Sequence, residues 1–91
     1  MVACAYILLC ADGCYYYGST TDLHERLLRH QRGRVRATAW RRPVQLVYFE
    51  VFADIEQARR RERGFKNGRT RRATIEKLIA EFPPERLQTL V

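Results

Sequence analysis

The chain has 91 residues, of which 46% are hydrophobic, which is enough for one compact core and too little for two. Its 17 basic and 10 acidic residues give a net charge of +7. No apolar run approaches the roughly 20 residues of a membrane-spanning helix, and the N-terminus lacks the pattern of a signal peptide. We therefore expect a single cytoplasmic domain with no membrane partner.

Arginine accounts for fifteen of the seventeen basic residues. Its planar guanidinium donates two parallel hydrogen bonds to a phosphate and keeps its charge. Together with a pI near 9.9, this composition indicates a polyanionic partner, of which nucleic acid is the most plausible. An arginine-rich composition can also reflect a GC-rich or heat-adapted source, so the placement of the charges must decide.

The three cysteines are odd in number and lack the paired spacing of a zinc site. Cys4, Cys10 and Cys14 are therefore expected to be reduced thiols.

Three segments have the composition of β-strands: residues 3–10, 14–18 and 44–53. The turn signal Asp12-Gly13 joins the first two and predicts an antiparallel hairpin. The sequence leaves the place of the third strand in the sheet open.

Capping signals and apolar periodicity predict three helices, over about residues 22–32, 54–66 and 70–82. Asp22 and Glu25 form a capping box for the first helix, which Gly33 can end. Asp54 and Gln57 have the same spacing at the start of the second. The order β-β-α-β-α-α predicts an α+β fold, in which three helices flank a small, mostly antiparallel three-stranded sheet.

The end of the third helix sets the predicted domain boundary. Thr70 is the expected cap of this helix, and Pro83-Pro84 should end it. We expect one domain over residues 1–82 and a loose C-terminal tail over residues 83–91.

The hairpin loop determines which tyrosines share a face of the sheet. A two-residue loop places Tyr6 on the face of Tyr15 and Tyr17. A three-residue loop, with Gly13 in the left-handed conformation, places Tyr6 on the face of Tyr16 instead. One residue of slip moves every side chain to the other face, and local chemistry alone leaves both forms open.

Two short motifs flank this loop, CAY at residues 4–6 and YYG at residues 16–18. Their order and spacing resemble those of the GIY-YIG nuclease domain, and the similarity continues through residues 19–23 and 58–67. The resemblance spans nearly the whole chain, which suggests a short, single-domain member. It departs from the family in the first motif, which lacks the glycine and the isoleucine.

The resemblance implies that the tyrosines Tyr6 and Tyr16 share the active face, which favours the three-residue loop, and that Tyr17 is a packing residue. It implies a catalytic set of five residues: Tyr6, Tyr16, Arg26, His30 and Glu62. Glu62 matches the metal-binding glutamate of the family, and a divalent ion, with Mg²⁺ expected, is the implied cofactor.

The residues themselves support part of this set. Arg26 and His30 are four apart and lie together along one border of their helix's apolar stripe. The alternative is that Arg26 pairs with Asp22 while His30 lies at the surface.

Glu62 falls within an inward-facing stripe of the second helix, where a carboxylate is costly unless it is paired or binds a cation. Pairing with Arg59 or Lys66 is the structural alternative. Glu50, on the third strand, is the reserve candidate for a metal ligand.

Two basic stretches are candidates for nucleic-acid binding. The loop between the first helix and the third strand contributes Arg34, Arg36, Trp40, Arg41 and Arg42, and the segment before the third helix contributes Lys66, Arg69, Arg71 and Arg72. The arginines can follow a phosphate backbone, whereas Trp40 can stack on a base or cover the edge of the core. Asn67 lies near the second patch without an assigned role.

The sequence and the resemblance together predict a metal-dependent endonuclease that hydrolyses phosphodiester bonds in nucleic acid, with DNA favoured over RNA. Tyr6 or Tyr16 would help to activate water, which requires nearby positive charge to lower its pKa. The first alternative is a non-catalytic nucleic-acid-binding module that retains the fold. A second is a domain recruited by a protein partner through its tail region.

Overall fold

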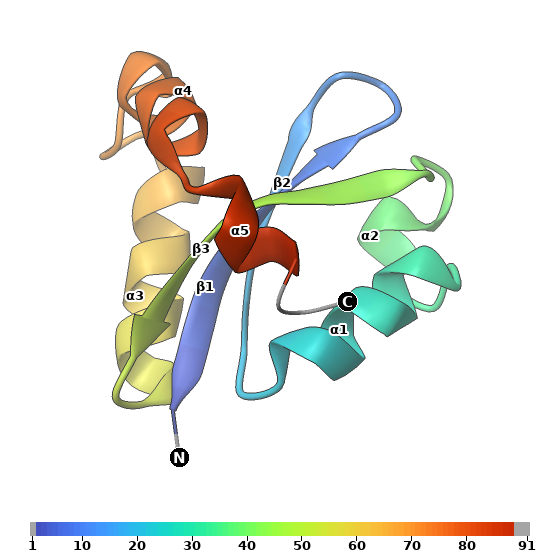
Figure 1. The fold of residues 1–91 in the computed structure, drawn as a ribbon, viewed down its shortest axis with the longest axis horizontal. Helices are drawn as coiled ribbons and strands as arrows, with labels where there is room; N and C mark the ends of the chain where they lie inside the picture. Colours follow the sequence, from blue (N-terminus) through green and yellow to red (C-terminus); the bar gives the residue numbers. More distant parts are fainter. Residues whose placement is uncertain (1, 89–91) are drawn as a thin grey trace.

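The computed structural model describes residues 2–88 and contains one antiparallel sheet with the strand order β2-β1-β3 (Figure 1). The strands are β1 Ala3–Cys10, β2 Tyr15–Thr20 and β3 Val44–Phe52. The central strand β1 carries three consecutive fully buried residues, Tyr6, Ile7 and Leu8. Burial of side chains of this size stabilises the fold by roughly 1.5–3 kcal/mol each. The predicted α+β fold is confirmed, and the third strand lies beside the first.

The helices are α1 Leu23–Gln31, α2 Arg36–Ala39, α3 Ile55–Lys66, α4 Arg72–Glu81 and α5 Pro84–Gln88. The three predicted helices are α1, α3 and α4, whereas the two short ones were not predicted. Helix α2 lies inside the basic segment that was expected to be a loop. Within residues 2–88, no helix combines the length and the apolar character needed to cross a bilayer.

Two of the three predicted helix starts are confirmed by their capping contacts. The Asp22 and Asp54 carboxylates accept hydrogen bonds from the backbone N–H groups of Glu25 and Gln57, at 3.1 Å and 2.9 Å. The prediction that Thr70 caps the third helix is wrong, because the N-cap of α4 is Arg71. The Thr70 N–H donates to the Gly64 carbonyl at 3.1 Å, so Thr70 belongs to the closing turn of α3.

The hairpin between β1 and β2 has the three-residue loop. The Cys10 N–H donates to the Cys14 carbonyl at 2.9 Å, and Gly13 has a φ of +83°. Tyr16 therefore lies opposite Leu8, two residues along β1 from Tyr6, and shares its face. The predicted register is confirmed.

The sheet has helices on both faces (Figure 1). Helix α3 contacts all three strands on one face, where the Phe65 ring lies 5.5 Å from that of Tyr17. Helices α1 and α2 lie against the other face, where the His30 ring lies 5.1 Å from that of Tyr16. Tyr17 is thus a packing residue, as predicted.

Helices α4 and α5 cover the open edge of β3. The Phe82 ring, which follows α4, lies 5.1 Å from the rings of both Tyr48 and Phe49, whose side chains point to opposite faces. The Arg86 guanidinium of α5 lies 4.7 Å from the centre of the Phe49 ring. The expectation of a loose tail is therefore wrong for residues 84–88, and residues 89–91 lie outside the described residues.

The packing of Tyr6 against β2 requires a glycine opposite it. A Cβ added at Gly18 would overlap the Tyr6 ring and hydroxyl, whereas a Cβ at Gly64 on α3 would meet nothing within 4 Å.

We expect Gly18→Ala to lower the free energy of unfolding by about 1–3 kcal/mol, because the buried tyrosine cannot move aside. Gly64→Ala is the control and should raise the free energy of unfolding by up to about 1 kcal/mol through helix propensity. Urea unfolding measures both changes. A Gly18→Ala protein as stable as wild type would contradict the observed packing.

Candidate active site

A chain of three buried polar side chains links β1, α1 and α2. The Tyr6 hydroxyl lies 2.9 Å from His30 Nε2, and His30 Nδ1 lies 2.7 Å from Thr38 Oγ1. All three residues are completely buried. The Thr38 hydroxyl donates to the Val35 carbonyl at 3.5 Å, so its oxygen is left to accept a hydrogen bond from the Nδ1–H group. The arrangement places the His30 proton on Nδ1 and leaves Nε2 to accept from Tyr6.

Burial controls the ionisation of this chain. It lowers the pKa of His30 to about 4, and the positive charges of Arg26 and Arg29 act in the same direction. It also raises the pKa of Tyr6 to about 12, and this effect exceeds the lowering by Arg26. At neutral pH His30 is therefore uncharged and Tyr6 is protonated. The expected lowering of the pKa is thus absent for Tyr6, because desolvation outweighs the arginine charge.

Tyr16 lies beside this chain on the same face of the sheet. Its ring centre is 6.4 Å from that of Tyr6 and 5.1 Å from that of His30. Tyr16 is half-buried, whereas Tyr6 is fully enclosed. The structure therefore brings together both tyrosines and the histidine that the sequence singled out.

Arg26, one turn before His30 on α1, completes this group. The neighbouring Tyr6 hydroxyl raises the pKa of Arg26. Its Nε is buried and has no hydrogen-bond partner within the described part of the chain. A buried N–H without an acceptor is costly and suits an anionic ligand. The alternative pairing of Arg26 with Asp22 is absent among the ion pairs of residues 2–88.

Glu62 of α3 approaches the site across the β2 edge. Its side chain is 18% exposed, and Oε1 accepts a hydrogen bond of 2.5 Å from the Ser19 hydroxyl on β2. Oε2 accepts a hydrogen bond from the Lys66 ammonium, which is the structural pairing considered as the alternative. The Glu62 charge also contributes to the raised pKa of Tyr6, so its field reaches the phenol.

The reserve candidate Glu50 is engaged elsewhere. Its Oε2 accepts hydrogen bonds from the Tyr48 hydroxyl at 2.6 Å and from Arg61 at 3.0 Å. Both partners lie on β3 and the neighbouring side of α3, away from the β2 edge. Glu50 therefore has a structural ion pair, and Glu62 is the better-placed carboxylate.

Two residues of this site were not found from the sequence. Ser19 and Thr38 are hydroxyl residues whose partners lie 43 and 8 residues away. Nothing in the local pattern separates them from other small polar residues.

The basic segment around α2 is partly exposed and partly tied to the rest of the fold. Trp40 is 76% exposed, so the alternative that it covers the core edge is wrong. Arg41 forms an ion pair of 2.9 Å with Asp12 in the hairpin loop, and Arg42 donates to the carbonyls of Ala39 and Gln31. These contacts anchor the segment around α2 to the hairpin and to α1.

The remaining basic candidates lie at the surface. Arg34, Arg36, Lys66, Arg69, Arg71 and Arg72 are exposed. The Arg72 guanidinium pairs with Glu76 at 3.0 Å and lies 5.0 Å from the centre of the Tyr15 ring. Lys66 pairs with Glu62, and the other four side chains are exposed to solvent.

Comparisons with known proteins identify the family of this chain. The sequence model described as the GIY-YIG catalytic domain matches residues 2–76. The chain belongs to the GIY-YIG family. GIY-YIG is a nuclease family, and nucleic acid is its substrate. The matched region ends within α4, and the division at residues 82 and 83 stays a prediction.

Relatives of this GIY-YIG chain come from bacteria. A UPF0213 protein of Bacillus pumilus is 47% identical over 62 residues, which cover 67% of this chain and 63% of the relative. A UPF0213 protein of Streptococcus pyogenes is 46% identical over 67 residues, 72% of this chain and 73% of that one. The NMR structure of a UPF0213 protein from Bacillus halodurans, 34% identical, has a TM-score of 0.57 over 98% of this chain and 95% of that one.

Burial of neutral His30 predicts a pH-dependent stability. The pKa of His30 is about 4 in the folded protein and about 6.5 in the unfolded chain, which therefore binds more protons between these values. Proton uptake by His30 on unfolding should therefore lower the free energy of unfolding by about 2–3 kcal/mol as the pH falls from 6.5 to 4.

Urea unfolding at several pH values tests this prediction. His30→Gln should remove the slope in this window, whereas the control His24→Gln, at an exposed position of the same helix, should retain it. Equal slopes in wild type and His30→Gln would contradict a buried neutral imidazole.

Proposed function

We propose that this protein is a metal-dependent endonuclease that hydrolyses phosphodiester bonds in nucleic acid, with DNA favoured over RNA. The observation that supports this most strongly is the position of the Tyr6 hydroxyl. It is hydrogen-bonded to a neutral histidine and lies beside the half-buried Arg26, whose buried Nε has an open donor, and the Glu62 charge also acts on it. This cluster of side chains can accept a proton and can neutralise the negative charge of a phosphate.

Tyr6 and His30 act together as the proton acceptor for the attacking water. Because the pKa of Tyr6 is about 12, a free phenolate is rare at neutral pH. In the proposed relay the water proton passes to the Tyr6 oxygen while the Tyr6 proton passes to His30 Nε2, so the charge to be stabilised is an imidazolium whose pKa burial lowers to about 4. Thr38 holds the imidazole in the tautomer that leaves Nε2 open. Tyr16 borders the same space and helps to position the nucleophile.

Arg26 neutralises charge on the phosphoryl oxygens in the transition state. Its buried Nε has no acceptor in the described structure, so a phosphate oxygen would satisfy a donor that is already desolvated. A donor held in place before the reaction stabilises developing charge without reorganisation. The exposed arginines around α2, with Arg71 and Arg72 at the start of α4, hold the flanking backbone through phosphate contacts.

The carboxylate Glu62 is the proposed ligand of a divalent ion, with Mg²⁺ the expected one. No group of three His, Cys, Asp or Glu side chains among the described residues could hold a metal. Mg²⁺ commonly binds one or two carboxylates and keeps several waters, and Glu62 with the Ser19 hydroxyl fits that mode. The ion pair of Glu62 with the Lys66 ammonium supports a role for this carboxylate in holding positive charge. When bound, the ion polarises the phosphate and stabilises the leaving oxygen.

The same Glu62–Lys66 pair favours the alternative function, a nucleic-acid-binding module without catalysis. If this pair is structural, a carboxylate within the packed face of α3 needs no metal. Removal of the Glu62 charge separates the two functions, because it abolishes cleavage only if Glu62 holds a metal ion.

We expect Glu62→Gln to lower cleavage at least about 100-fold while nucleic-acid affinity and folding are retained, because several kcal/mol of charge stabilisation by the metal are lost. The matched control is Glu50→Gln, which removes an equal charge from the Arg61 pair and should retain cleavage. Labelled branched, single-stranded and double-stranded substrates, each with Mg²⁺ or a chelator, provide the assay.

Three outcomes separate the possibilities. Normal cleavage by Glu62→Gln would contradict its role as a metal ligand. Loss of folding in Glu62→Gln but not in Glu50→Gln would show that the Lys66 pair is structural. Salt-dependent binding by the wild type, with no cleavage of any substrate, would establish the binding module.

A further inference from the structure

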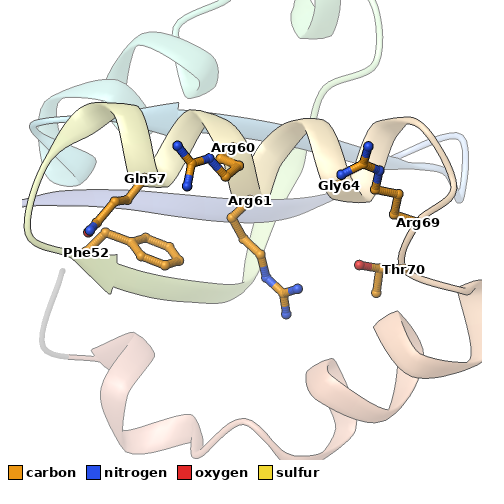
Figure 2. A pocket seen from close by; sticks show the side chains of 7 residues that line it. All are labelled: Phe52, Gln57, Arg60, Arg61, Gly64, Arg69 and Thr70. Carbon is orange, nitrogen blue, oxygen red and sulfur yellow. The ribbon is translucent and has the colours of Figure 1, made fainter.

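Figure 2 shows the residues around a hollow of about 480 Å³ beside α3. The hollow is lined by Phe52, Gln57, Arg60, Arg61, Gly64, Arg69 and Thr70. Four of these residues recur at helical spacing along one stripe of α3, which places them on the side of the helix away from Glu62. Glu62 instead points to the β2 edge, where it meets Ser19. Because a helix with its side chains is about 10–12 Å wide, the hollow is separate from the candidate active site.

Three arginines give this hollow its charge. Arg61 is held in place by Glu50 at 3.0 Å, and its guanidinium lies 4.6 Å from the centre of the Phe65 ring. Arg60 and Arg69 have no ion-pair partner within residues 2–88. No carboxylate lines the hollow. Two open guanidinium groups on the rim of a concave surface favour a phosphate.

The rest of the lining supplies shape and an aromatic surface. Gly64 leaves the helix surface open, since a Cβ there would meet nothing within 4 Å. The half-buried Phe52 ring lies at the other end, below the helix in Figure 2. Thr70 is fixed by its hydrogen bond to the Gly64 carbonyl, so α3 and the following loop form one wall.

We propose that this hollow binds a nucleoside phosphate, with the phosphate held by Arg60 and Arg69 and the base against Phe52. Its volume lies within the roughly 300–1,000 Å³ of small-molecule sites. Aromatic rings accept any base through stacking, and arginine supplies the phosphate contacts. A free nucleotide and an unpaired nucleotide of a nucleic acid share this chemistry. The site goes beyond the nuclease function and does not depend on cleavage at Glu62.

The test is a titration followed by NMR, for which a chain of 10.8 kDa is well suited. The probes are adenosine monophosphate, inorganic phosphate, and a short single-stranded oligonucleotide. We expect the monophosphate or the oligonucleotide to shift the backbone amides of Gly64 and Thr70. Wild type and Glu62→Gln should respond equally, which separates this site from the proposed active site.

Matched double variants on α3 and its loop measure the contribution of the arginines. Arg60→Ala/Arg69→Ala should weaken monophosphate binding at least about 10-fold. Arg59→Ala/Arg63→Ala removes the same charge from exposed positions outside the hollow and should change binding less than 3-fold. Phe52→Leu should weaken binding of the monophosphate but leave that of inorganic phosphate unchanged.

The outcomes distinguish the sources of the ligand. Binding of the free monophosphate identifies a nucleotide site, and binding of the oligonucleotide alone identifies a nucleotide within a strand; both support the proposal. Amide shifts confined to the surface around Ser19 and Arg26, equal losses in the two double variants, or equal affinities for monophosphate and inorganic phosphate would each overturn it.

Discussion

The hydrogen-bond chain from Tyr6 through His30 to Thr38 is the constraint on which the candidate site depends. Three polar side chains are removed completely from water, and each would be costly without a partner. Tyr6 and Thr38 satisfy the two ring nitrogens of His30. The chain thereby ties the central strand to α1 and positions the short helix α2. A segment rich in arginine is in this way fixed beside the proposed reacting groups.

This constraint also sets the electrostatics of the site. The burial that orders the three side chains keeps His30 neutral and Tyr6 protonated. Proton transfer therefore uses the preformed contact between them rather than a preformed phenolate. Arg26 adds positive charge with an open donor, and Glu62 adds a carboxylate at the β2 edge. Arg26 therefore lies beside the Tyr6 hydroxyl, whereas Glu62 acts on it only through its charge.

Helix α3 divides the functional surface of the molecule. One side presents Glu62 to the candidate active site, and the stripe that includes Arg60 and Gly64 lines the separate hollow. Arg41, Arg61 and Arg72 pair with acidic residues within the fold, and these one-to-one pairs leave the net charge of +7 unchanged. The unpaired arginines are the ones available to a polyanion.

The sequence predicts the strands and the longer helices because their signals are local. The carboxylates of Asp22 and Asp54 cap the helices that begin beside them, and the left-handed Gly13 forms the hairpin turn in which it lies. The shared face of Tyr6 and Tyr16 required the resemblance, because local turn chemistry allowed two registers. Helix α2 has four residues, and its buried Thr38 is specified only by His30, a contact that no local pattern contains.

The central claim is that Thr38 and Tyr6 fix one neutral tautomer of His30, and nitrogen NMR of the imidazole tests it most directly. The ¹⁵N chemical shifts of the two ring nitrogens distinguish a protonated nitrogen from an unprotonated one. At pH 7 we expect a neutral ring with the proton on Nδ1 and none on Nε2. A proton on Nε2, or a doubly protonated ring at this pH, would contradict the account.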